Sequence, residues 1–83
     1  MFIIKNIIRE IQDNISHICL LQLNEGVLLT GTKNGDITQW RINDNNITFV
    51  SKKEKAHERN IYEMIKFNDL IISCSYDNSI RIW

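Results

Sequence analysis

Hydrophobic and polar positions alternate in short runs along the chain, and polar turns separate the runs. The segments that read as extended strands are 18–23, 27–32 and 37–42, then 61–67, 70–75 and 80–83. The middle segment of each set is apolar on both faces, as expected of a strand covered on both sides. Segment 47–52 is a more polar strand with a charged end, which suits an exposed sheet edge. The pattern predicts an all-β fold built from short antiparallel strands.

The runs occur twice because the sequence repeats itself at a period of about 43 residues. The heptapeptide 34–40 (NGDITQW) returns as 77–83 (DNSIRIW), and at the same offset Ile18 falls on Ile61. Further along this first strand, 21–23 align with 65–67 only if the offset increases by one residue. The turn at 24–26 restores the original offset. A repeat of this length indicates stacked supersecondary units that cannot bury their faces alone.

A tight turn joins the second and third strands of each unit. Asn34-Gly35 is a strong signal for a two-residue type I′ hairpin, since both residues tolerate positive φ. Asp77-Asn78 is a weaker version of the same signal. We therefore expect two-residue hairpin turns at both places.

A set of spaced residues in the second unit resembles the WD-repeat family of β-propellers, and 34–40 is similar to a second copy. The residues that carry the resemblance are His57, Ile61, Phe67, Ile71, Ile72, Ser73, Asp77, Ile80 and Trp83. The resemblance covers essentially the whole chain and implies two four-stranded antiparallel blades, which form an incomplete ring as a single chain. The units it implies are about 14–42 and about 57–83, with outer strands at about 7–12 and 47–52.

The resemblance also implies a structural hydrogen-bond network in the second unit. Trp83 would donate its indole N–H to Ser73, and the Ser73 hydroxyl would bond one ring nitrogen of His57. The other ring N–H of His57 would reach the Asp77 carboxylate. Such a chain of bonds would tie three strands and a loop together.

The first unit matches the same network less closely. Thr30, Asn34 and Trp40 take the places of the serine, aspartate and tryptophan, and Asn14 that of the histidine. His17 lies three residues beyond the matching position, so whether it can replace the missing histidine stays open.

Serine, histidine and aspartate are also the ingredients of a hydrolytic triad. Ser73 lies inside an apolar strand rather than on a Gly-x-Ser-x-Gly elbow, and no oxyanion-hole segment is recognisable. Cys19 and Cys74 form no C-x-x-C pair, and a metal site built from His17 and Cys19 is the weaker interpretation beside two small buried side chains. We expect no catalytic role, no metal and no cofactor.

Ten basic and ten acidic residues give a formal net charge of zero. The chain thus lacks the basic footprint that binding to nucleic acid or an anionic membrane requires. No apolar stretch approaches the length of a spanning helix. Two cysteines without a secretory signal favour a reducing compartment, so we expect a cytoplasmic protein.

The first fourteen residues allow two interpretations. Ile4, Ile7, Ile8, Ile11 and Ile15 fall at helical spacing, so an amphipathic helix over 2–15 is one of them. The register of the repeat favours the other, an outer strand over 7–12, and isoleucine suits strands better than helices.

Two blades cannot bend into a ring, and propellers use about four to eight. We therefore expect the chain to be a piece of a longer propeller or to assemble as a homo-oligomer. The function that we predict is a non-catalytic protein-protein interaction scaffold that binds a peptide or protein; a purely structural pair of blades is the alternative. The candidate partner-binding residues flank the turns and the loop after the second-unit histidine: Lys33, Glu58, Arg59, Asn60 and Tyr76.

Overall fold

The computed structural model describes residues 10–12, 14–44 and 46–83. Its strands are β1 (His17–Asn24), β2 (Val27–Thr32), β3 (Ile37–Asn43), β4 (Asn46–Lys53), β5 (Ile61–Phe67), β6 (Leu70–Ser75) and β7 (Ile80–Ile82). The expectation of an all-β fold is confirmed, since these ranges contain strands and turns but no helix. Accordingly, no helix in the described ranges could cross a membrane.

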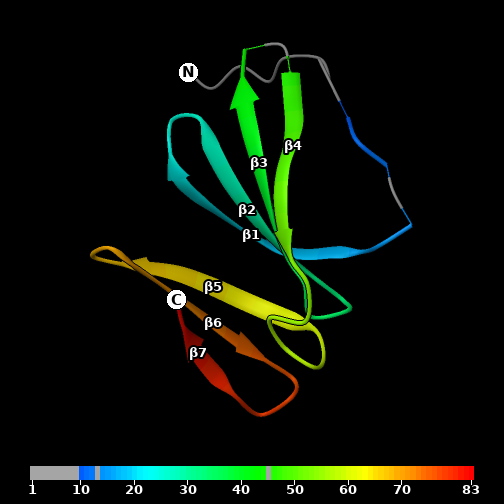
Figure 1. The fold of residues 1–83 in the computed structure, drawn as a ribbon, viewed down its shortest axis with the longest axis vertical. Helices are drawn as coiled ribbons and strands as arrows, with labels where there is room; N and C mark the ends of the chain where they lie inside the picture. The colour runs from blue at the N-terminus through cyan, green and yellow to red at the C-terminus, as the bar shows by residue number, and fades with distance from the viewer. Residues whose placement is uncertain (1–9, 13, 45) are drawn as a thin grey trace, which may run out of the picture.

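The strands form two antiparallel sheets, with the orders β1-β2-β3-β4 and β5-β6-β7 (Figure 1). The second sheet thus has three strands in the described part of the chain, where four were expected. Residues 10–12, the end of the expected outer strand at 7–12, have no regular secondary structure. Residues 7–9 lie outside the described residues, as does most of the 2–15 segment for which a helix was the alternative.

The core lies between the two sheets, where β5 packs on β1 and β2. Alternation along β1 turns every second side chain toward the other sheet, which is the pattern of a half-buried strand. The buried apolar side chains are Leu29, Ala56, Ile61 and Met64, with Cys19, Leu21, Leu23, Ile37 and Ile71 packed around them. Burial of these side chains is the main stabilising contribution to the contact between sheets.

Close approach of the sheets depends on Gly31 in β2. A Cβ at this position would lie 2.9 Å from Cγ2 of Ile61 and 2.8 Å from Sγ of Cys19. Ile61 is itself completely buried. The missing side chain at Gly31 therefore makes room for Ile61, the largest of the completely buried side chains.

The register of the two sheets differs from the sequence alignment in the first strand of each unit. His17 pairs with Thr32 in the first sheet, and Ile61 pairs with Ser75 in the second. Thr32 and Ser75 occupy equivalent positions in the two sheets. The residue of the first sheet that is equivalent to Ile61 is therefore His17, whereas the sequence alignment gave Ile18. The slip of one residue extends from His17 to Gln22 and ends at Asn24, and both strands carry an irregularity directly after the first pair.

The turns between the second and third strands are also different from the expected two-residue type I′ turns. Positive φ is found at Gly35 (87°) and Asn78 (70°), but not at the residue before either one. Each loop has three residues inside a closing backbone bond, in which Thr32 donates to Asp36 (3.0 Å) and Ser75 to Ser79 (3.3 Å). The backbone N–H of Gly35 donates to the carbonyl of Thr32 (3.2 Å). Asn78 donates to the carbonyl of Ser75 in the same way (3.2 Å). The hydroxyl groups of Thr32 and Ser75 accept further backbone N–H groups of the loops, which favours this longer form.

The β2–β3 turn of the first sheet lies against the connection from β4 to β5 (Figure 1). The backbone N–H of His57 donates to the carbonyl of Gly35 (2.9 Å). A Cβ on Gly35 would lie 1.9 Å from the carbonyl oxygen of His57, so no side chain fits between the two backbones. The turn is thus fixed both by its left-handed backbone and by this close contact.

We expect Gly35→Ala to lower the free energy of unfolding by about 2 kcal/mol or more, because the new methyl group adds steric overlap to a strained φ. Gly26→Ala is the matched control, since the nearest atom to its Cβ would be 3.7 Å away. The control should change stability by less than about 1 kcal/mol. Urea unfolding followed by tryptophan fluorescence measures both, and equal stability of the two variants would contradict the role given to this contact.

Candidate functional site

A chain of hydrogen bonds links β6, the end of the second sheet and the β4–β5 connection. Nε1 of Trp83 donates to Oγ of Ser73 (2.9 Å), and Oγ of Ser73 lies 2.7 Å from Nε2 of His57. Nδ1 of His57 lies 3.1 Å from Oδ2 of Asp77. The contacts expected from the sequence between these four residues are therefore all present. Since a carboxylate can only accept, Nδ1 carries the proton toward Asp77 and Nε2 accepts from the serine hydroxyl in the neutral ring.

Asp77 collects several donors besides the histidine. The hydroxyl of Ser79 donates to Oδ1, and so does the backbone N–H of Ser79 (2.9 Å). The backbone N–H of Glu58 donates to Oδ2 (3.0 Å). The Ser79 hydroxyl, followed by these N–H groups and the His57 ring, holds the pKa of Asp77 well below its usual range, although burial acts in the opposite direction.

The buried position of these groups decides what they can do chemically. Ser73 and His57 have no exposed surface, and the serine hydroxyl is engaged by both the indole and the imidazole. A hydroxyl group without access to solvent has no route to a substrate. The four side chains act as a structural tie between strands and connection.

The first sheet has a shorter version of this network. Nε1 of Trp40 donates to Oγ1 of Thr30 (2.9 Å), and Nδ1 of His17 lies 2.9 Å from the same oxygen. The ring of His17 also packs edge-on against Trp40, with centroids 5.8 Å apart. His17 reaches Thr30 from β1 itself, whereas His57 approaches Ser73 from the connection before β5.

Asn34 and Asn14 do not take the roles that the alignment gave them. Both side chains are exposed, and the backbone N–H of Asn34, not its amide group, bonds to Thr32 (3.3 Å). The physical reason is that the histidine of this unit comes from the strand, so nothing in the preceding loop requires an acceptor at Asn34. The buried carboxylate of this turn is instead Asp36, whose Oδ1 accepts the backbone N–H of Lys55 (3.0 Å).

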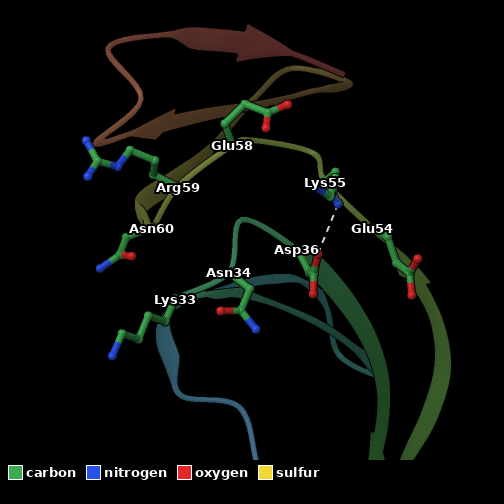
Figure 2. A pocket seen from close by; sticks show the side chains of 8 residues that line it. All are labelled: Lys33, Asn34, Asp36, Glu54, Lys55, Glu58, Arg59 and Asn60. Carbon is green, nitrogen blue, oxygen red and sulfur yellow. Dashed lines mark hydrogen bonds between the residues drawn. The ribbon is translucent and has the colours of Figure 1, made fainter.

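A polar cleft of about 480 Å³ opens between the β2–β3 turn and the β4–β5 connection (Figure 2). It is lined by Lys33, Asn34, Asp36, Glu54, Lys55, Glu58, Arg59 and Asn60. Four of the five residues that the sequence suggested for partner binding are therefore together in one cleft. The fifth, Tyr76, lies outside it and stacks on Tyr62 with ring centroids 4.9 Å apart.

Backbone hydrogen bonds hold the walls of this cleft. The N–H of Lys33 donates to the carbonyl of Ser16 (2.9 Å), and the carbonyl of Arg59 accepts from the Ser75 hydroxyl (3.1 Å). The carbonyl of Asn60 accepts from the N–H of Tyr76 (3.0 Å). The cleft is therefore rigid in its backbone, while its long side chains extend into solvent.

Four of the lining residues were not suggested for binding: Asp36, Glu54 and Lys55, which sequence reasoning missed, and Asn34, which it assigned to the hydrogen-bond network. A signal for Asp36 was available in the position directly after the turn, where aspartate readily accepts backbone N–H groups. Nothing local to the sequence marks Lys55, which has a positive φ of 52° and owes its place to Asp36.

Comparison of the chain with models of known protein families, with curated proteins and with solved structures finds no match.

We expect His57→Ala to lower the free energy of unfolding by about 2–3 kcal/mol, because it leaves a cavity at a fully buried position, removes the acceptor of the buried Ser73 hydroxyl proton and takes one donor from Asp77. His17→Ala is the control, since this ring is exposed and its loss should cost less than about 1 kcal/mol. Thermal unfolding by circular dichroism gives both values. A His57 variant as stable as the parent would contradict the role of the network.

Acid should weaken the fold through Asp77. Because the pKa of Asp77 is lower in the folded chain than in the unfolded one, the unfolded state binds more protons, and stability falls as the pH drops below about 4. Ser79→Ala removes the leading donor, so the folded pKa of Asp77 should rise toward the unfolded value and the loss of stability below about pH 4 should become smaller. Asp77→Asn should flatten the pH dependence. Unfolding midpoints between about pH 6 and pH 2 measure it, and identical acid profiles in the three chains would refute the assignment.

Proposed function

We propose that the chain is a pair of WD-repeat blades from a β-propeller and works as a non-catalytic scaffold for protein-protein interaction. A cytoplasmic location fits this role. Three features support the proposal: the period of the repeat, the agreement between the two sheets in strand order and turn form, and the tryptophan-hydroxyl-imidazole bonds found in both units. Fold alone does not give function, so the binding role rests on the cleft.

The single observation that carries the binding role is the convergence of Lys33, Glu58, Arg59 and Asn60 in one cleft. These residues come from two loops that are separated by two strands in the sequence. Arginine is a residue type enriched at binding surfaces, and rigid loops lose little conformational entropy when a partner binds. The cleft is therefore the surface on which we expect a peptide or a protein loop to bind.

The alternative is a purely structural pair of blades that completes a larger propeller. The observation that favours it is the apolar surface on the outward sides of both sheets. Leu20 is 68% exposed in the first sheet, and Ile80 is 72% exposed in the second. Side chains of this kind are normally covered by a neighbouring element.

A selection of peptides from a displayed random library, carried out on the intact chain, tests the proposal. We expect selected peptides to lose about tenfold in affinity for the double variant Lys33→Ala/Arg59→Ala, because both side chains are exposed in the cleft. Lys66→Ala, which removes an exposed cation on β5 outside the cleft, is the control and should bind as the parent does. Failure to select any peptide, or equal binding to parent and double variant, would favour the structural alternative.

A further inference from the structure

We propose that the partner of this cleft is an acidic peptide, whose carboxylates bind Lys33 and Arg59; this inference rests on the proposed function. The formal charges of the lining residues cancel, with three cations and three carboxylates. The charges that remain available to a partner do not cancel. The protein's own groups bind the carboxylates of the cleft more than they bind its cations.

Among the described residues, the cationic groups of the cleft have no carboxylate partner. Within the described ranges, no carboxylate forms an ion pair with the side chain of Lys33, Lys55 or Arg59. All three residues are exposed at the surface. In Figure 2 the side chains of Lys33 and Arg59 extend from the two loops at the same end of the cleft.

Two of the three carboxylates are already engaged. Asp36 accepts the backbone N–H of Lys55 (3.0 Å), and Glu54 lies 3.6 Å from the ammonium group of Lys52. In Figure 2 both acidic groups are at the end of the cleft opposite Lys33 and Arg59. Glu58 is the remaining carboxylate, and its side chain forms no ion pair in the part of the chain that the structure describes. Asp36 keeps its charge, but with Glu54 paired to Lys52 the lining has three cations against two carboxylates, and the end that holds Lys33 and Arg59 is positive.

The chemistry of the lining also favours a charged occupant over an apolar one. Every lining side chain is polar or charged, so the cleft has no pocket for an aliphatic or aromatic anchor. Tyr76, the aromatic residue suggested for binding, lies outside the cleft and stacks on Tyr62. Guanidinium groups bind carboxylates through two parallel hydrogen bonds, which gives Arg59 a geometric preference for glutamate or aspartate side chains.

The backbones of the two cleft loops are ordered without a bound partner. The backbones of Lys33, Arg59 and Asn60 are each fixed by a hydrogen bond to another segment. The bonds that fix Arg59 and Asn60 come from Ser75 and Tyr76, at the end of β6. An acidic peptide would therefore meet cations that project from fixed positions, and its own ordering would be the main entropic cost of binding.

Three fluorescein-labelled peptides of one length, with about four consecutive Glu, Gln or Lys residues between Gly-Ser flanks, test the proposal by anisotropy on the intact chain. We expect the Glu peptide to bind at least about tenfold more tightly than the Gln peptide, because the interaction requires charge. Its affinity should fall several-fold between about 50 mM and 300 mM NaCl.

Charge reversal provides the second arm. Lys33→Glu/Arg59→Glu should reduce affinity for the Glu peptide by at least about tenfold and raise affinity for the Lys peptide. Lys66→Glu makes a cation-to-carboxylate change outside the cleft and should leave the preference unchanged. Circular dichroism and thermal midpoints equal to those of the parent show that each variant is folded.

The outcomes separate this inference from the proposed function. Equal, cleft-dependent binding of the Glu and Gln peptides would refute acidic recognition and keep the binding platform. Absence of binding by all three peptides would overturn the inference, and together with an empty library selection it would also remove the platform. Tighter binding of an oligouridine than of the Glu peptide, lost in the charge-reversed variant, would assign the cations to nucleic acid and contradict the proposal.

Discussion

The contact between the β2–β3 turn and the β4–β5 connection is the interaction on which the rest of the structure depends. The carbonyl of Gly35 accepts the N–H of His57, and the carboxylate of Asp36 accepts the N–H of Lys55. These bonds fix the connection at the point where its histidine enters the second sheet. The imidazole then joins Ser73 to a carboxylate in the next loop. A turn of one sheet thereby positions the hydrogen-bond network of the other.

The same contact shapes the cleft. Its two walls are the turn and the connection, so any change that separates them also removes the cleft. Lys55 has a left-handed backbone, which costs about 1–3 kcal/mol for a residue with a side chain and persists because the buried Asp36 holds its N–H. Stability and the candidate binding surface therefore share one set of backbone bonds. Variants that probe binding are best made at exposed side chains, where this set is not disturbed.

Strand positions could be predicted from the sequence because the alternation of apolar and polar residues is local, and the observed strands begin and end close to the predicted residues. The contacts of His57 and Ser73 followed from a resemblance in spacing. The first unit was harder because its first strand has a second irregularity, between Gln22 and Asn24, which the second unit lacks. The sequence placed a one-residue slip late in this strand, but it did not reveal that the slip begins at His17. The cleft depends on two loops that meet in space. The sequence pointed to Lys33, Glu58 and Arg59 among its charged residues. It pointed neither to Glu54 nor to the bond between Asp36 and Lys55.

The outward faces of the two sheets are not copies of the faces that pack inside the molecule. Inside, Ile61 fills the space that Gly31 leaves empty. At the equivalent positions on the outward faces, the first sheet has His17 and the second has Cys74. If a second copy docked head to tail, His17 of one copy would face Cys74 of the other. Inside the molecule, the equivalent contact is between Ile61 and Gly31. This mismatch opposes the endless addition of copies by which repeated, self-complementary surfaces grow into fibres.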